Sequence, residues 1–234
     1  MEGDEIVFQH EEDGRRTGEY LPETAAADLK SLLEAGGARP PFGFSAQQIA
    51  IEQWAEKNGL WFDWSVISNG EQKGGVEHFV KPLLEQGRIL KITIPPVFGR
   101  HPVINSAGAL LIGDATPLEC LGRWNLHNTL LRSDTRVAGV TAQKEGFPSF
   151  VFTQRYAEGP PPTIELSNDW FAQHGYERIP NEWIFYNPKE RIALFDARPA
   201  NLVWSEGTVV PVDVIPSLAS EPMHRALLKM LDNL

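Results

Sequence analysis

The sequence predicts an α+β protein made of two parts that a connector joins. Short segments rich in β-branched and aromatic residues fill the region 60–153, and one clear helix interrupts them. A Gly/Pro-rich connector follows at 154–162. A helix, a hairpin, two short apolar segments and a final helix then make up 163–234. A helical extension at 1–59 precedes these parts.

Composition and charge narrow the classes of function. The 234 residues carry a formal net charge of -10 at pH 7. This charge argues against a general surface for nucleic acid or anionic membranes, which would need clustered Lys and Arg, so we expect neither partner. The single cysteine, Cys120, excludes an intrachain disulfide and a Cys-based zinc site, and it fits a reducing, cytoplasmic setting. No segment has the apolar length of a membrane span.

The sequence of the N-terminal extension, residues 1–59, predicts two helices. One is expected from Leu21 to Ala35, and a second begins with Ser45 as its cap and ends at Gly59. We interpret this extension as a packing element, with a partner-binding surface as the alternative.

The region after the extension predicts three strands, at 60–67, 76–80 and 88–94, with a Gly-rich turn between the first two. Lys91 interrupts the third strand. A lysine among apolar residues is unfavourable unless its amine reaches water or an anion. Lys91 is therefore either an edge-strand lysine that extends to solvent or a lysine that reaches nucleotide phosphates. After Pro95-Pro96 a loop is expected up to Gly113.

A capping box then marks a helix. Thr116 is the expected N-cap, Pro117 occupies the first turn, and Glu119 completes the box. Glu119 has two interpretations: a cap without catalytic duty, or an ion-pair partner of Lys91.

The remaining elements are short. We expect strands at 136–140 and 149–153, a helix that Thr163 caps, a hairpin over 183–195 and a final helix over 217–234.

Three oxygen-bearing side chains follow the predicted hairpin: Asp196, Asn201 and Asp213. Phosphoryl transfer needs a carboxylate that orients the attacking hydroxyl, and oxygen ligands that hold Mg²⁺ on the nucleotide phosphates. The three residues together could supply both. Turn formation is the alternative for Asp196 or Asn201 taken singly, because both residue types favour turns.

These residues resemble the protein kinase-like fold. The run Asp196-Ala-Arg-Pro-Ala-Asn201 is similar to the catalytic loop D-x-[KR]-P-x-N, and Asp213 stands at the distance of the metal-binding aspartate of D-F-G. Lys91 is similar to the V-A-I-K lysine, and Glu119 lies in the helix that would be αC. Over about 60–216 the chain is most similar to the kinase-like domains of phage and mobile-element polyvalent proteins. The resemblance implies a minimal bilobal fold, with an antiparallel sheet and one helix in the N-lobe and a reduced C-lobe.

The resemblance also implies ATP and Mg²⁺ as ligands, and a role for each residue. Asp196 would accept or orient the proton of the substrate hydroxyl, and Arg198 would stabilise charge on the transferred phosphoryl group. Asn201 and Asp213 would hold the Mg²⁺ ion.

The remaining implied roles concern the nucleotide. Lys91 would hold the α and β phosphates, positioned by Glu119. A phosphate-covering loop would contain Gly70, Gly74 and Gly75. The adenine would meet backbone groups at the start of the connector, at Gln154, Arg155 and Tyr156.

Several positions depart from the kinase pattern. Phe195 precedes Asp196 where kinases usually carry Arg, and Val-Ile-Pro follows Asp213 in place of Phe-Gly. The Gly-rich segment lacks G-x-G-x-x-G spacing. From Asp213 to Leu234 we expect no activation segment and no peptide-binding helical lobe. Nucleotide and metal binding are therefore favoured over peptide phosphorylation.

Three functions remain open at this point. The first is a phosphotransferase that uses ATP and Mg²⁺ and acts on a protein, a small molecule or itself. The second is a catalytically inactive nucleotide-binding pseudokinase that acts through a partner. The third is a structural or interaction protein that uses the fold alone.

Overall fold

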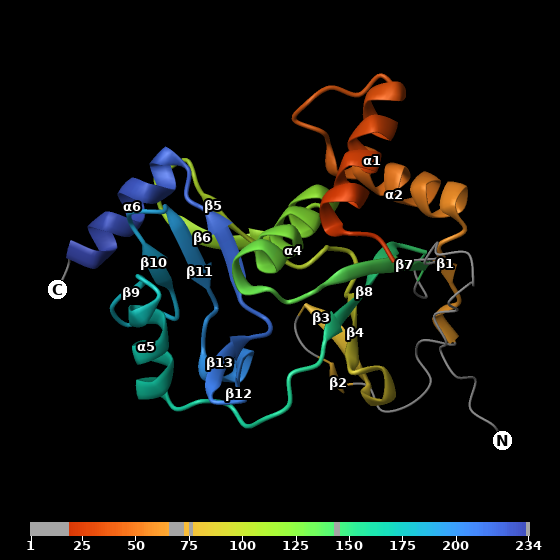
Figure 1. Ribbon diagram of the computed structural model, residues 1–234. Helices are drawn as coiled ribbons and strands as arrows, with labels where there is room; N and C mark the ends of the chain where they lie inside the picture. The colour runs from red at the N-terminus through yellow and green to blue at the C-terminus, as the bar shows by residue number, and fades with distance from the viewer. Residues whose placement is uncertain (1–18, 66–72, 75–76, 143–145, 233–234) are drawn as a thin grey trace. The chain divides into compact units, whose positions relative to one another are not determined.

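The structure is a computed structural model that describes residues 19–65, 73–74, 77–142 and 146–232. It has the α+β class that the sequence predicts (Figure 1). The chain forms two compact units. Unit 1 comprises Met1–Gly99, Asp114–Asn125 and Asp134–Tyr156, and unit 2 comprises Arg100–Gly113, Leu126–Ser133 and Ala157–Leu234.

Unit 1 is built on a six-stranded sheet. In order across the sheet, its strands are β1 (Trp61–Phe62), β7 (Arg136–Ala142), β8 (Pro148–Arg155), β4 (Arg88–Thr93), β3 (His78–Leu83) and β2 (Lys73–Gly74). β1 runs parallel to β7, and the other pairs are antiparallel. A 3₁₀ turn, η1 (Leu84–Gln86), joins β3 to β4. The strand that carries Lys91, β4, is therefore central.

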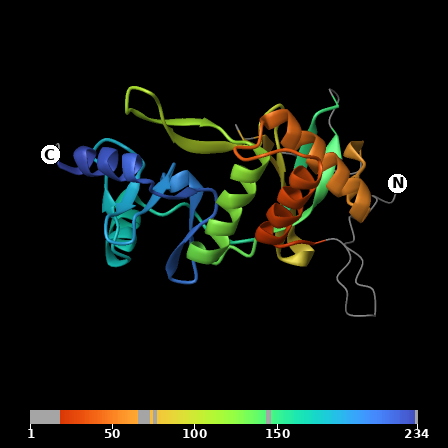
Figure 2. The ribbon, with the colours of Figure 1, turned by 90° about the horizontal axis from the view of Figure 1, so that it is seen from above.

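Helices bury one face of this sheet. Figures 1 and 2 show α1 (Pro22–Ala35) and α2 (Phe44–Asn58) next to each other beside the sheet, where both contact β7. α4 (Pro117–Leu131) adds its first turns to the same core. This core contains Leu29, Ile51, Trp54, Leu121, Trp124, Val137, Phe150 and Phe152. The N-terminal helices are thus part of the core of unit 1.

Unit 2 contains a four-stranded antiparallel sheet. Its strands, in order, are β14 (Ile215–Leu218), β11 (Ile192–Phe195), β10 (Phe185–Asn187) and β9 (Glu177–Arg178). Two ribbons accompany it, β12 (Leu202–Ser205) with β13 (Thr208–Pro211) and β5 (Arg100–Ile104) with β6 (Leu110–Asp114). Figure 2 shows the second ribbon in yellow-green. The 3₁₀ turn η2 (Pro199–Asn201) leads into β12.

Helices pack on both faces of the sheet in unit 2. α6 (Glu221–Asp232) places Met223 and Leu227 in a core with Tyr186 of β10. α5 (Ile164–Gln173) places Phe171 in a second core with Phe185, the neighbouring residue of β10. Successive side chains of a strand point to opposite faces, so α5 and α6 cover opposite faces.

Several local predictions are confirmed. The Thr116 amide donates to Oε2 of Glu119 over 2.7 Å, and the Glu119 amide donates to Oγ1 of Thr116 over 3.3 Å. This is the expected capping box. Thr163 caps α5, since its Oγ1 accepts from the Leu166 amide over 3.2 Å. Gly59 ends α2 with a φ of 66°.

Two loop and cap predictions are wrong. Gly43, and not Ser45, is the N-cap of α2, because Ser45 already lies within the helix. The loop expected up to Gly113 contains the β5–β6 ribbon. Its turn is closed by Asn105, whose Oδ1 accepts from the amides of Ala107 (3.0 Å) and Ala109 (2.9 Å).

Two element boundaries also differ from the prediction. The strand expected at 60–67 shortens to β1, which lies at the opposite edge of the sheet from β2. The final helix begins at Glu221, because Ser217 and Leu218 pair with β11 as part of β14. Among the described residues, no helix combines the length and the apolar character that crossing a membrane requires.

Candidate functional site

The register of two strands brings the predicted motif residues of unit 2 to one end of the sheet. Phe195, the last residue of β11, pairs with Ile215, the first residue of β14. Asp196 directly follows β11, and Asp213 stands two residues before β14. Because the strands are antiparallel, both aspartates emerge at the same end of the sheet.

Asn201 holds Asp196 in an uncommon backbone conformation. Asp196 has a φ of 51°, in the left-handed region that few non-glycine residues occupy. The Asn201 side chain is buried, and its Nδ2 donates to the carbonyl oxygen and to Oδ2 of Asp196, each over 2.7 Å. The Asn side chain therefore fixes both the backbone and the carboxylate of Asp196.

Two further contacts complete this arrangement. Nε of Arg198 lies 3.2 Å from Oδ1 of Asp196, in an ion pair whose arginine side chain is about half exposed. The Asn201 carbonyl accepts from the amides of Val212 (3.0 Å) and Asp213 (3.3 Å). The four residues that the sequence singled out here, Asp196, Arg198, Asn201 and Asp213, thus form one connected cluster within unit 2.

The donor set of this cluster limits how a metal could bind. Among the described residues, no three His, Cys, Asp or Glu side chains gather in a metal-binding group. Mg²⁺ commonly uses one or two carboxylates and completes its shell with water and substrate phosphate. The Asp213 carboxylate and the Asn201 side-chain oxygen fit this way of binding Mg²⁺, in which water and the nucleotide phosphates supply the remaining ligands.

In unit 1, Lys91 lies in a buried position. It pairs with Val80 on β3 and Phe152 on β8, and only 4% of its surface is exposed. Its Nζ lies 4.8 Å from the ring centroid of Trp124 on α4. The interpretation of Lys91 as an edge-strand lysine that extends to solvent is therefore wrong, because β4 has a neighbour on each side.

Residues that the sequence did not single out surround the same indole. The guanidinium of Arg123 lies 5.2 Å from the Trp124 ring centroid, and the ring of His78 lies 5.7 Å from it. Arg123 is hydrogen-bonded and ion-paired to Glu77, and its side chain is 2% exposed. The available signal was an arginine placed directly before Trp124 in a helix with a broad apolar face.

The remaining predicted residues are placed as follows. Glu119 belongs to the capping box in unit 1, and a role toward Lys91 stays a prediction. Gly74 lies in β2, whereas Gly70 and Gly75 fall outside the described residues. Gln154 and Arg155 still belong to β8 and pair with Ile89 and Arg88.

The expectation of a free backbone at the connector is wrong for Tyr156. Its amide donates to the Gly87 carbonyl over 2.9 Å, which continues the pairing of β8 with β4. Within unit 2 the connector is also fixed, because the Trp204 amide donates to the Pro160 carbonyl over 2.8 Å. Gly159, with a φ of 150°, passes so close to β12 that a Cβ would lie 2.0 Å from the Trp204 oxygen.

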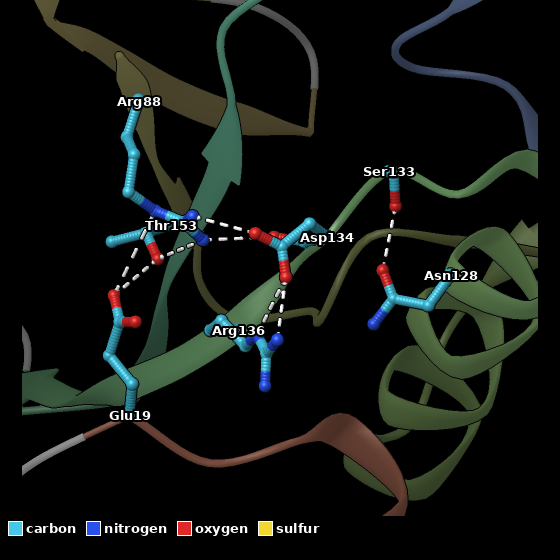
Figure 3. Close-up of polar contacts among 7 residues, drawn as sticks. All are labelled: Glu19, Arg88, Asn128, Ser133, Asp134, Arg136 and Thr153. Atoms are coloured by element: carbon cyan, nitrogen blue, oxygen red, sulfur yellow. Dashed lines mark hydrogen bonds and ion pairs between the residues drawn. The ribbon is translucent and has the colours of Figure 1, made fainter. Parts of the chain in front are cut away.

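A polar network lies where β4, β7 and β8 meet the N-terminal segment (Figure 3). Arg88 donates through Nη1 to Oδ2 of Asp134 and through Nη2 to Oγ1 of Thr153, each over 2.9 Å. Thr153 donates to Glu19 over 2.6 Å, and Arg136 pairs with Oδ1 of Asp134 over 2.7 Å. Burial raises the pKa of Asp134, but the hydrogen bonds from Arg88 and Arg136 outweigh it and leave this pKa below its ordinary value. The network therefore favours an ionised Asp134.

The single cysteine is not placed for nucleophilic chemistry. Cys120 is buried on α4, and this burial raises the pKa of its thiol to about 12. A thiol with such a pKa holds almost no thiolate at neutral pH.

Comparisons with known proteins do not assign a family. The chain was compared with family models, with curated proteins and with solved structures, and none of the three gave a match. The kinase-like relationship stays a prediction from the motif residues.

Proposed function

We propose that the chain is a phosphotransferase of minimal bilobal kinase-like fold that uses ATP and Mg²⁺. It transfers the γ-phosphoryl group to a hydroxyl of a protein or a small molecule. The observation that carries the proposal is the cluster in unit 2, where Asn201 bonds Asp196 twice over 2.7 Å and its carbonyl accepts the Asp213 amide. Turn formation by Asp196 and Asn201, the alternative interpretation, would not require Asp213 beside them.

Asp196 is the group that orients the acceptor hydroxyl. Its carboxylate is partly exposed, so a substrate hydroxyl can approach it. The bond from Asn201 Nδ2 fixes the direction of Oδ2, and the ion pair with Arg198 fixes Oδ1. Catalysis of phosphoryl transfer consists mostly of such positioning and of charge stabilisation. Arg198 adds a partly exposed positive charge beside the carboxylate for the transferred group.

Asn201 and Asp213 are the proposed metal ligands. Asn201 uses its side-chain nitrogen on Asp196, and its side-chain oxygen is the atom type that Mg²⁺ prefers. The backbone hydrogen bond from the Asp213 amide to the Asn201 carbonyl keeps the two residues next to each other. A bound Mg²⁺ would supply the positive charge that an acidic chain needs to hold a nucleotide.

Lys91 is the proposed phosphate ligand in unit 1. A buried ammonium interacts with a phosphate more strongly than an exposed one, because the local dielectric constant is lower. The Trp124 ring, 4.8 Å away, holds the amine through a cation–π contact. The support from Lys91 is its chemistry and burial within its own unit.

A second candidate function has a specific observation in its favour. Both carboxylate oxygens of Asp196 already have partners, Arg198 on Oδ1 and Asn201 on Oδ2. A substrate hydroxyl would have to displace one of these partners to reach the carboxylate, which favours a nucleotide-binding pseudokinase that acts through a partner. In that case the chain would bind ATP and Mg²⁺ without transferring phosphate.

Transfer of labelled γ-phosphate tests the proposal and separates the two candidates. The wild type is incubated with labelled ATP and Mg²⁺, with general protein acceptors, and alone to detect self-labelling. We expect label transfer that falls at least about 100-fold in Asp196→Asn, the range for loss of a positioned acid or base. Asn tolerates the left-handed backbone, so this substitution changes the chemistry more than the fold.

The matched control is Asp169→Asn, at an exposed position on α5. It should transfer label like the wild type. Label transfer that is equal in the wild type and in Asp196→Asn would overturn the phosphotransferase proposal. ATP binding without any transfer would favour the pseudokinase.

A further inference from the structure

The β5–β6 ribbon of unit 2 (Figure 2) is an uncharged element with exposed apolar side chains. No Asp, Glu, Lys or Arg stands between Arg100, which begins β5, and Asp114, which ends β6. Three apolar side chains of the ribbon are exposed: Val103 to 37%, Leu111 to 49% and Ile112 to 43%. Proteins usually protect a free strand edge with charged residues or proline, because an apolar edge pairs with other chains. This ribbon lacks the charges.

The register of the ribbon decides which of its backbone groups are free. At the tip, the Asn105 amide donates to the Ala109 carbonyl over 3.0 Å. Hydrogen-bonded and non-hydrogen-bonded positions alternate along an antiparallel pair. Val103 and Leu111 therefore form the next hydrogen-bonded pair. A Cβ at Gly113 would lie 3.5 Å from Cγ2 of Val103, which agrees with this register.

Two residues of β6 direct their backbone groups away from β5. Leu110 and Ile112 flank the hydrogen-bonded position of Leu111, so their amides and carbonyls lie on the outer edge of β6. Among the described residues, β6 pairs with β5 alone, and no hydrogen bond reaches the amides of Leu110 and Ile112. The residue of β5 opposite Ile112 is Pro102, which has no amide to offer. The outer edge of β6 is therefore the one equipped to pair with a further strand.

Unit 2 holds the ribbon through one of its faces. β5 contacts β14 and α6, and Ile104 and Leu110 pack against the core that contains Leu227. Successive side chains of a strand point to opposite faces, so Val103 and Leu111 lie on the face away from this core. The ribbon thus presents a free edge and an apolar outer face while its inner face is anchored.

We propose that two copies of the chain pair through the outer edges of β6, antiparallel and about a two-fold axis at Leu111. Leu110 of each copy exchanges two backbone hydrogen bonds with Ile112 of the other. This pairing uses the outward amides and carbonyls of both residues. The two Leu111 side chains meet at the axis on the outer face, and Val103 of each copy flanks them. The result is one four-stranded sheet made from two ribbons.

Charge favours a second copy as the occupant of this edge. The chain carries a formal net charge of -10, so two copies repel each other over most of their surface. The uncharged ribbon is a place where they can approach. In the antiparallel arrangement the two Asp114 side chains stand at opposite ends of the pair, each across from Gly108, so like charges do not meet. A charged partner would find no opposite charge within the ribbon. The inference does not depend on nucleotide binding.

Sedimentation velocity of the full chain tests the pairing. Short interfaces are weak, so the concentration series extends to about 1 mM. We expect a reversible monomer–dimer equilibrium, with a sedimentation coefficient that rises with concentration.

Two variants assign the dimer to the β6 edge. Leu111→Lys places like charges directly opposite each other at the axis and should raise the dimer Kd at least about tenfold. Ile112→Pro removes an amide of the outer edge but no bond between β5 and β6, so it should cause a similar loss and leave the ribbon intact. Ile49→Lys, at a side chain of α2 that is 55% exposed, is the matched control and should dimerise like the wild type.

A mixture of charge variants tests the register. Leu111→Lys and Leu111→Glu should each be monomeric alone, whereas an equimolar mixture should regain the dimer, because opposite charges then face each other across the axis. A general loss of folding in either variant would not produce this recovery.

Three results would overturn the inference. The first is a wild type that stays monomeric throughout the series. The second is a dimer that persists unchanged in Leu111→Lys and Ile112→Pro. The third is a charge mixture that stays monomeric, because Leu111 would then not lie at the axis.

Discussion

At the scale of single residues, the backbone of Asp196 is the feature on which the site in unit 2 depends. Its φ of 51° is unfavourable for an L-residue, and the two bonds from Asn201 offset that cost. The same bonds aim the carboxylate. One side chain, Asn201, therefore serves both stability and the geometry of the proposed catalytic group.

This dual role predicts the effect of Asn201→Ala. The change removes two hydrogen bonds, one of them to a carboxylate, and leaves the Asp196 backbone without support. We expect the free energy of unfolding to fall by about 2–3 kcal/mol in urea titrations. Gln173→Ala, exposed on α5, should change it by less than about 0.5 kcal/mol. A loss of similar size in both variants would show that the bonds to Asp196 contribute little.

At the scale of elements, the polar network of Figure 3 joins three strands of unit 1 to the N-terminal segment. Arg88 begins β4, Arg136 begins β7 and Thr153 lies near the end of β8, so the network gathers strand ends at one place. Asp134 is its only residue with two arginine partners among the contacts drawn there. The network should therefore depend on the ionisation of Asp134.

Asp134→Asn tests this dependence on pH. The pKa of Asp134 in the folded chain lies below its value in the unfolded chain, about 3.9. The stabilisation is therefore present above that pH and is lost as the pH falls through the folded-state pKa. We expect the variant to be less stable by about 1 kcal/mol at pH 7, with the difference shrinking as the pH falls below about 4. Asn tolerates the φ of 51° at this position, so the backbone should persist.

The control for the network is again Asp169→Asn on α5. Its stability should follow that of the wild type across the same range in urea titrations. A stability difference for Asp134→Asn that stays constant from pH 7 to pH 3 would contradict the ionic role.

Local sequence signals predicted elements well where short-range chemistry decides the structure. The Thr116–Glu119 box and the Thr163 cap were readable because each involves residues within three positions. The β5–β6 ribbon was missed, although the Asn105 turn between apolar residues was a usable signal. Ser217 lies within the predicted final helix, whereas its pairing with Ala193 on β11 places it in β14.

At the scale of the whole molecule, the motif residues could be named from the sequence because the spacing of Asp196, Asn201 and Asp213 is itself the signal. The surroundings of Lys91 could not be named in this way. The burial of Arg123 depends on how α4 packs against the sheet, which involves residues that are far apart in the sequence. The central position of β4 likewise follows from sheet order and not from its own composition.

Nucleotide binding by the full chain is the central claim, because the proposed roles of Lys91 and Asp213 both depend on it. Lys91 is the proposed phosphate ligand, and Asp213 is a proposed ligand of Mg²⁺. Replacing either residue should therefore weaken the binding of ATP with Mg²⁺.

The most direct measurement is the stabilisation of the full chain against heat by ATP with Mg²⁺. At a ligand concentration of about 100 times Kd, we expect a gain of about 2.7 kcal/mol in the free energy of unfolding. Lys91→Met and Asp213→Asn should each lose most of this gain, whereas Lys189→Met, at a side chain that is 90% exposed, should keep it. No stabilisation of the wild type at millimolar ATP, or equal stabilisation in all four proteins, would contradict the account.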